Sequence, residues 1–426
     1  MNNKEENAMR ERYNNNQGLA PNLRFPIYSK SGNWKLTDLG PFLREYTEKV
    51  PSSTELPVYS STRVGLQPQK DYYDDRELAN DGDYGVVPDG YFVYRHMSDD
   101  GTFKFNVNRL GGKIAVSKEY PVFSVEGIDP TFLQYLLNEG IAFKRFALAQ
   151  KKGGTRTRLY LGVLRTFSAH MPRQEEQMII GDCLWSLDEL IVAESQKLRT
   201  LSLKRKSLLQ ILFPSTGESH PRLRLPEFSN SKPWRREFIS NLLEKVTKPV
   251  DVDTSTTYRE IGIRSHGKGI FHKDPILGIN LGEKRVFWVE QNALVINIVF
   301  AWEQAIAVTS EADKGMIASH RFPMYIPKQG IDVRFLKYLF LTSKGKELLG
   351  VASPGGAGRN KTLGQKEFEK LELAIPEDVS EQTAIVKILS SIDDLIALQG
   401  QKIDFLKKNK AGLVQQLFPT SNEKPT

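Results

Sequence analysis

The sequence predicts an α+β protein in which two globular domains are joined by two long antiparallel α-helices that form a coiled coil, with internal pseudo-two-fold symmetry. Residues 177–214 align without a gap onto residues 382–419, at a constant offset of 205. Both segments carry apolar side chains at helical spacing, and each follows a longer block of mixed strand and helix patterns. A repeat of this length indicates a duplicated architecture.

The apolar positions of the two long helices match one for one. Even the polar interruptions agree, because Glu194 aligns with Gln399 and Arg205 with Lys410. Each helix has about 40 residues and therefore a length of roughly 60 Å. The predicted coiled-coil seam consists of Ile180, Leu184, Leu187, Ile191, Leu198, Leu201, Leu208, Leu212, Ile385, Leu389, Ile392, Ile396, Ile403, Leu406, Leu413 and Leu417.

We expect the two apolar stripes to cover each other, since both present the same seam and run along the whole helix. The alternative is that each stripe packs on its own globular block. An antiparallel pair agrees with a two-fold relation between the halves, and the segment between them is long enough to turn the chain back.

The repeat extends into the globular blocks. Residues 22–26 match residues 222–226, and Trp34 matches Trp234, both at an offset of 200. Ile114–Phe123 lies over Met316–Tyr325 at an offset of 202. The centres of the two blocks, residues 51–112 and 251–315, show little identity. A shared frame around divergent centres is typical of two related binding sites for different targets; the alternative is a duplication without functional meaning.

Turn formers and prolines set the expected boundaries. Pro172 is tolerated in the first turn of a helix, Pro214 ends the first long helix, and Asp129-Pro130 signals the start of a short one. The expected segments are a lead-in (1–20), a first domain (21–170), a first long helix (171–214), a linker (215–226), a second domain (227–374), a second long helix (375–419) and a tail (420–426). Within the domains we expect strands at Tyr91–Tyr94, Ile114–Val116, Leu294–Phe300 and Ile306–Val308, and short helices at Pro130–Asn138 and Val333–Leu341.

Composition favours an intracellular, nucleic-acid-binding protein. The 426 residues are 39% hydrophobic and 26% charged, with a net charge of +8, and the sequence pI is about 9.2. A basic chain favours an acidic partner such as nucleic acid. The single cysteine, Cys183, excludes a disulfide framework and fits a reducing cytoplasm. The longest apolar stretch, Ala293–Trp302, is too short to span a membrane.

Catalytic and metal signatures are missing from the sequence. The loop Gly355–Thr362 resembles a phosphate-binding loop, but Asn360 stands where its second glycine must be. His266 and His272 are the nearest pair of histidines, and no cysteine joins them. We therefore expect no catalytic residue, no metal site and no cofactor in this chain, which favours a reader and scaffold over an enzyme.

The repeated segments resemble the conserved regions of type I restriction-modification specificity subunits. The resemblance rests on PRQEEQ (Pro172–Gln177) with PEDVSEQ (Pro376–Gln382), on the Ser186–Leu190 and Ser391–Leu395 segments, and on the Leu-Phe-Pro endings. It covers nearly the whole chain. One departure is Val379-Ser380, where other members often have Leu or Pro before the Glu-Gln pair.

This resemblance implies that each globular domain is a target recognition domain that reads one part of a split sequence in double-stranded DNA. The helical pair would separate the two readers, set the unread spacer and dock two methyltransferase subunits. Restriction subunits would join through the methyltransferase core. The partners would methylate adenine with S-adenosylmethionine, or cleave DNA with ATP and Mg²⁺.

Residues that contact DNA are expected in the variable centres and in the loops after the double glycines. Direct readout needs polar, basic or aromatic side chains that reach the major groove. The earlier loops are the better candidates for bases and the loops after the glycines for phosphates; for any single residue the alternative is a solvated surface charge. The candidates are Ser61, Thr62, Arg63, Tyr94, Arg95, His96, Lys151, Lys152, Arg156, Arg158, Arg264, Ser265, His266, Lys268, Asn297, Arg359, Asn360 and Lys361.

The shared frame is expected to serve structure and docking. Trp34 and Trp234 would lie in the core or contact a methyltransferase. Glu176, Gln177, Glu381 and Gln382 would face a partner or cap their own helices. Two other functions stay open: a stand-alone DNA-binding regulator or decoy without a methyltransferase partner, and an enzyme whose site the sequence does not reveal.

Overall fold

The computed structural model of the chain describes residues 18–72, 82–151, 156–215, 218–355 and 361–419. These residues form two compact units. Unit 1 comprises the chain up to Ser195 together with the segment from Lys402 onward, and unit 2 comprises Gln196–Gln401. Each unit therefore contains one globular domain and one half of each long helix, α6 (Gln174–Ile211) and α11 (Val379–Leu417).

Unit 1 is built on antiparallel strands. The central sheet has the order β2-β11-β7-β9, a second sheet has the order β10-β6-β3, and β1 pairs with β13, β4 with β5 and β8 with β12. The strands are β1 (Lys35–Asp38), β2 (Leu43–Tyr46), β3 (Lys49–Val50), β4 (Tyr59–Thr62), β5 (Gly65–Pro68), β6 (Tyr84–Val87), β7 (Phe92–Tyr94), β8 (Met97–Ser98), β9 (Phe105–Val107), β10 (Ile114–Ser117), β11 (Val122–Val125), β12 (Thr157–Arg158) and β13 (Ser168–Met171). The helices are η1 (Pro26–Tyr28), η2 (Gly40–Phe42), α2 (Gln69–Tyr72), α3 (Pro130–Glu139), α4 (Ile141–Ala149) and α5 (Leu161–Leu164).

Unit 2 repeats this frame. Its central sheet has the order β15-β24-β21-β22, and β14 pairs with β25, β16 with β19, β17 with β18 and β20 with β23. The strands are β14 (Arg235–Phe238), β15 (Leu243–Val246), β16 (Thr257–Tyr258), β17 (Ile261–Ile263), β18 (Ile270–His272), β19 (Ile276–Leu277), β20 (Val286–Trp288), β21 (Leu294–Ile296), β22 (Ile306–Val308), β23 (Ile317–Ser319), β24 (Met324–Pro327) and β25 (Glu372–Ile375). The helices are η3 (Pro226–Phe228), α7 (Ile239–Leu242), η4 (Gly278–Leu281), η5 (Ala301–Glu303), η6 (Glu311–Asp313), α8 (Val333–Leu341), α9 (Ser343–Val351) and α10 (Gln365–Glu369).

The two cores have the same aromatic arrangement. In unit 1 the Trp34 and Phe132 rings meet edge to face with centroids 6.1 Å apart, and Phe418 lies 5.4 Å from Phe132. In unit 2 the rings of Trp234 and Phe335 are 5.6 Å apart, and Phe213 lies 5.1 Å from Phe335. Phe418 follows α11 and Phe213 follows α6, so the end of each long helix packs under the domain from which the other long helix starts.

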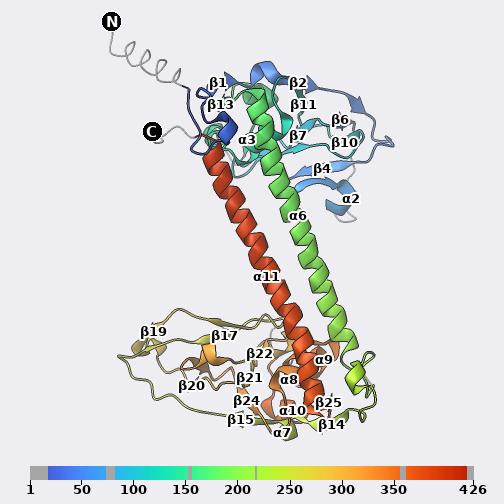
Figure 1. Cartoon of the computed structure of the whole chain (residues 1–426), viewed down its shortest axis with the longest axis vertical. Helices are drawn as coiled ribbons and strands as arrows, with labels where there is room; N and C mark the ends of the chain where they lie inside the picture. The colour runs from blue at the N-terminus through green and yellow to red at the C-terminus, as the bar shows by residue number, and fades with distance from the viewer. Residues whose placement is uncertain (1–17, 73–81, 152–155, 216–217, 356–360, 420–426) are drawn as a thin grey trace. The chain divides into compact units, whose positions relative to one another are not determined.

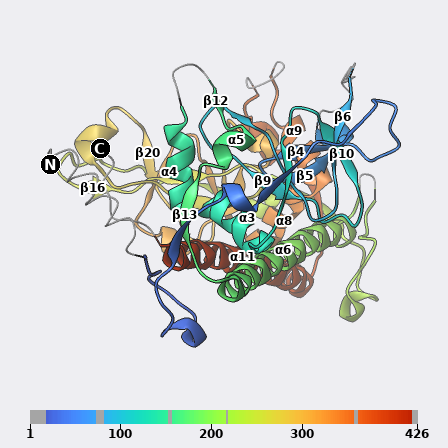
Figure 2. The same cartoon turned by 90° about the horizontal axis from the view of Figure 1, so that it is seen from above.

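The long helices run antiparallel within each unit (Figure 1). In unit 1 the Lys410 ammonium donates to Asp188 of α6 at 2.8 Å, and Lys402 pairs with Glu194. In unit 2 Arg205 pairs with Asp393. Seen from above, α3 of unit 1 lies against α6 (Figure 2), and its Tyr135 hydroxyl donates to Asp188 at 2.6 Å.

All sixteen seam residues are buried or half-buried. Ile180 and Leu184 join the core of unit 1, whereas Ile385 and Leu389 join that of unit 2. The start of each stripe therefore packs on its own domain core, as the alternative had it, whereas Leu212 and Leu417 near the far ends join the core of the other unit. The two long helices, the mixed domains and the internal repeat confirm the predicted fold class.

Most predicted elements appear with small shifts in their bounds. The short helices begin where expected, at Pro130 and Val333, because Asp129 and Asp332 accept hydrogen bonds from backbone amides of the first turn. The expected strand Leu294–Phe300 was too long, since β21 ends at Ile296. There the Asn297 side-chain oxygen accepts the Val299 amide at 3.1 Å and turns the chain. The long helices begin at Gln174 and Val379, slightly later than expected.

Candidate nucleic-acid interface

In each unit, a buried ion pair fixes the start of the long helix that begins there. The Arg24 guanidinium donates to both carboxylate oxygens of Glu176, at 2.8 and 2.7 Å, and the Trp34 indole donates to the same carboxylate at 3.3 Å. Arg224 contacts Glu381 at 2.8 and 2.7 Å in the same way. Only 2% of each glutamate side chain is exposed, so these carboxylates do not face a partner.

The neighbouring glutamines are structural as well. Gln177 accepts the backbone amide of Asp129 and donates to the carbonyl of Pro172, both at 3.0 Å. Gln382 bonds to the Asp332 amide and the Pro376 carbonyl in the same way, at 3.0 and 3.2 Å. The expectation that these side chains face a partner or cap their own helix was wrong, because they join a domain to the helix.

In unit 1, Arg63 and Val64 form the tip of the hairpin between β4 and β5. The Thr62 hydroxyl donates to the Gly65 carbonyl at 2.8 Å and accepts the Val64 amide at 3.2 Å, and Gly65 has a φ of 125° that favours glycine. These bonds close the turn and direct both tip side chains outward. Val64 is 80% exposed.

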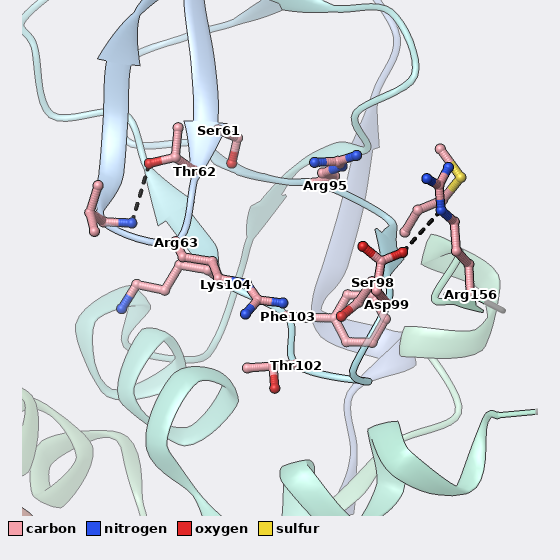
Figure 3. A pocket seen from close by; sticks show the side chains of 12 residues that line it. Ser61, Thr62, Arg63, Arg95, Ser98, Asp99, Thr102, Phe103, Lys104 and Arg156 are labelled. Carbon is pink, nitrogen blue, oxygen red and sulfur yellow. Dashed lines mark hydrogen bonds and ion pairs between the residues drawn. The ribbon is translucent and has the colours of Figure 1, made fainter. Parts of the chain in front are cut away.

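The tip borders a pocket of about 270 Å³ in unit 1. Figure 3 shows the cationic side chains of Arg63, Arg95, Lys104 and Arg156 around it. Arg156 Nε donates to Asp99 at 3.0 Å. Arg95 is exposed and has no recorded partner in the described part of the chain. Burial lowers the pKa of Lys104.

Asp100 stands beside this pocket and is tightly held. Its Oδ1 atom accepts the Thr102 amide at 3.0 Å, the Arg63 guanidinium at 2.7 Å and the Ser98 hydroxyl at 2.8 Å. These bonds, with the one from the Thr102 amide first, hold the pKa of Asp100 well below its usual range. The carboxylate therefore stays ionised and keeps Arg63 in one place.

Several predicted DNA residues of unit 1 lie inside the domain. The Ser61 hydroxyl donates to the Val93 carbonyl at 3.3 Å and accepts from Asn106 at 2.9 Å. The Tyr94 hydroxyl donates to the Leu159 carbonyl at 3.0 Å, and burial raises the pKa of this phenol. The buried His96 ring stacks on Tyr160. These side chains, like the buried Thr62, support the loops from beneath.

The remaining candidates of unit 1 are exposed at the surface. Lys151 follows α4, and Arg158 lies on β12, which pairs with β8, the strand just before Asp99. Arg156 belongs to the same segment. Lys152 lies outside the described residues.

In unit 2, the loop between β17 and β18 brings Arg264, Ser265, His266 and Lys268 together. The His266 amide donates to the Glu303 carbonyl at 2.7 Å, and the Ser265 hydroxyl donates to the Glu303 carboxylate at 2.8 Å, so η5 holds the loop. The Arg264 guanidinium is folded back: it donates to the Ile270 carbonyl at 3.3 Å and lies 4.6 Å from the centre of the Phe271 ring. The His266 and Lys268 side chains are exposed.

The other candidates of unit 2 are separate from this loop. Asn297 is buried and ends β21, whereas Lys361 is half-buried with its ammonium 5.9 Å from the centre of the Trp302 ring. Arg359 and Asn360 lie outside the described residues.

Sequence reasoning missed a second pocket, of about 260 Å³, in unit 2. Phe287, Phe322 and Met324 contribute apolar groups to its lining; Lys245, Arg285 and His320 contribute basic ones, and no carboxylate lines it. The sequence contains one indication of this pocket, the alignment of the two halves. In that alignment His320 matches Lys118, which lines the corresponding pocket of unit 1.

The described residues contain no group of three or more His, Cys, Asp or Glu side chains that could hold a metal ion. Cys183 is half-buried, and burial raises the pKa of its thiol. Within the same described ranges, no helix is long and apolar enough to cross a bilayer. The arrangement thus offers exposed basic side chains on supported loops in both units.

Residues 273–408 match the family described as "Type I restriction modification DNA specificity domain". A Methanocaldococcus jannaschii protein named as the specificity subunit of the type I restriction enzyme MjaX is 22% identical over 351 residues, which cover 76% of this chain and 79% of that protein. Along most of its length the chain is similar to a type I restriction-modification specificity subunit. The matched family and this relative are both named for specificity within type I restriction systems.

Solved structures share the fold of this chain. The S subunit of a type I system from M. genitalium superposes with a TM-score of 0.59 at 12% identity, covering 95% of this chain and 100% of that one. A chain from a structural study of complex assembly in the type I restriction-modification system gives a TM-score of 0.51 at 13% identity, covering 90% and 97%. The resemblance drawn from the repeated helix motifs is confirmed.

Proposed function

We propose that this specificity subunit reads a bipartite DNA target, with unit 1 on one half-site and unit 2 on the other. The observation that carries the proposal is the combination of one repeated frame with two unlike recognition loops. In unit 1 the tip arginine, Arg63, is held by Asp100, whereas in unit 2 Arg264 folds back onto Phe271. Two readers that differ in this way would recognise two different sequences.

The long helices would set the unread gap between the half-sites. With 38 and 39 residues they are each roughly 57 Å long, which is between one and two turns of B-DNA. The ion pairs between the two helices within each unit support their antiparallel pairing. The expected gap is several base pairs.

The same rod would dock two methyltransferase subunits, and restriction subunits would join through that core. Partly exposed apolar side chains on the outer faces of the helices support a docking role: Trp185 and Val192 on α6, Leu398 and Phe405 on α11. The partners would use S-adenosylmethionine, ATP and Mg²⁺. The specificity subunit would need none of these.

The test is a sequence-preference profile of the subunit in complex with its methyltransferase, measured on a duplex library in which every base pair is varied. We expect two short blocks of preference separated by several base pairs that tolerate any base. One continuous block, or equal binding to all sequences, would refute the bipartite function. If the chain purifies from its native cells with no methyltransferase bound to it, the stand-alone regulator is favoured.

A further inference from the structure

The hairpin between β4 and β5 presents a pair of side chains whose chemistry suits base edges. A two-stranded ribbon fits the major groove of B-DNA, where each base pair shows its own pattern of donors and acceptors. Residues Thr62 and Gly65 pair across the turn, which leaves Arg63 and Val64 at its end. Their side chains are 62% and 80% exposed, respectively.

The Arg63 guanidinium is oriented before any ligand arrives. Its Nη2 atom donates to Asp100 Oδ1 at 2.7 Å, and that oxygen is itself fixed by the Ser98 hydroxyl and the Thr102 amide. Nε and Nη1 of Arg63 have no recorded partner among the described residues. An exposed ion pair of this kind contributes little to stability. Its effect is to present the remaining N–H donors in a fixed fork, which lowers the entropy lost on binding.

Val64 distinguishes a base-reading tip from a phosphate-binding one. An exposed valine gains nothing from a phosphate, whereas an apolar side chain in the major groove contacts the methyl group of thymine. Among the neighbouring cations, Arg95 pairs with no other residue of the described chain, and Arg156 pairs with the highly exposed Asp99. Arg95 can follow a phosphate wherever it lies, whereas Arg63 pairs with a carboxylate that Ser98 and Thr102 hold in place.

We propose that Arg63 reads one guanine in the half-site of unit 1, through donors to N7 and O6 on the major-groove edge, and that Asp100 is the positioning residue for this contact. Bidentate arginine contact with guanine is the commonest specific contact in this groove. The inference rests on the proposed function, because it names the base that one of the two readers selects. No carboxylate among the described residues pairs with Arg264, which contacts Ile270 and Phe271 instead, so the half-site of unit 2 would be read by a different set of contacts.

The experiment replaces each guanine of the unit 1 half-site with 7-deazaguanine, which lacks the N7 acceptor, and measures binding by the complex with its methyltransferase. We expect the wild-type protein to lose roughly fivefold or more in affinity at one guanine. The Arg63→Ala variant should bind both duplexes equally, while its preference for the unit 2 half-site is unchanged. If no guanine shows this dependence on Arg63, the inference is overturned.

Asp100→Asn tests the positioning role. The asparagine side chain keeps an oxygen that can accept the hydrogen bonds from the Ser98 hydroxyl and the Thr102 amide, but it lacks the negative charge that faces Arg63. We expect discrimination at that one guanine to fall, with the unfolding temperature and the binding to random DNA unchanged. The matched control is Glu126→Gln. It likewise removes a negative charge from an exposed ion pair, in which Glu126 lies 3.0 Å from the Arg44 guanidinium. A general loss on all sequences would make Asp100 merely structural.

Failure of the inference is distinguishable from failure of the proposed function. If the wild-type profile shows two blocks of preference but no guanine is recognised through Arg63, only the inference is lost. If the wild-type complex has no preference for sequence at all, the bipartite function itself is lost.

Discussion

The length of the paired helices should determine the number of unread base pairs. In unit 1, Glu194 of α6 pairs with Lys402 of α11, so the positions after Ser195 and after Gln401 lie at the same level of the helix pair. Seven residues inserted at both positions lengthen both helices together. One heptad also brings the apolar seam back to within about 20° of its original direction, so the helices can still pair.

The magnitude follows from helix geometry. Seven residues at 1.5 Å each add about 10.5 Å, and B-DNA rises about 3.4 Å per base pair. If the rod lies along the duplex, the unread gap grows by about three base pairs, and by fewer if the rod is tilted. The two half-site sequences should not change, because the reading loops lie in the globular parts of the units.

The assay is the same sequence-preference profile, measured on wild-type and lengthened chains in complex with the methyltransferase. A longer gap between unchanged half-sites supports the account. A lengthened chain that folds and binds with the original gap would show that the helices do not set it. An insertion in α6 alone is the control: it shifts one seam against the other and should lower the unfolding temperature.

Three further predictions concern single side chains. Glu381→Ala removes one partner of a buried ion pair and should lower the free energy of unfolding by about 3–5 kcal/mol in urea titrations. Glu377→Ala, which breaks an exposed pair, should cost at most about 1 kcal/mol; equal effects would contradict the structural role of the buried pair. Arg95→Ala should weaken binding to all sequences and lower the slope of log binding constant against log salt concentration by about one. A loss of affinity confined to one sequence would argue against a phosphate contact. Val64→Asp should abolish any preference for thymine over uracil in the unit 1 half-site, because a carboxylate makes no apolar contact with the methyl group; a preference that survives would place the methyl contact elsewhere.

The frame could be predicted because the chain contains it twice. Matching heptad positions in two segments constrain a helix more strongly than one apolar stripe does, and both long helices appear within a few residues of their expected bounds. The role of Glu176 and Glu381 could not be deduced in the same way. Their partners, Arg24 and Arg224, are more than 150 residues away along the chain, and only folding brings them together.

The loops that we propose to contact DNA were harder to predict, because residue type alone does not reveal exposure. Ser61 and Asn297 are polar residues in the variable centres, yet the structure buries both and uses them to hold loops. Asp100 was not among the predicted DNA-contacting residues, because a carboxylate repels phosphates. Its role is to hold Arg63 in place. The pocket of unit 2 draws its three basic side chains from three separate segments, which only the folded sheets bring into one place.

The most direct test of independent reading is a chain in which residues 222–375 replace residues 22–171, so that both ends of the helix pair carry the second domain. The antiparallel frame then predicts a target that is an inverted repeat of the unit 2 half-site, with the wild-type gap. The measurement is the sequence-preference profile of this chain with its methyltransferase. A profile that retains the unit 1 half-site sequence, despite the loss of its domain, would contradict the account.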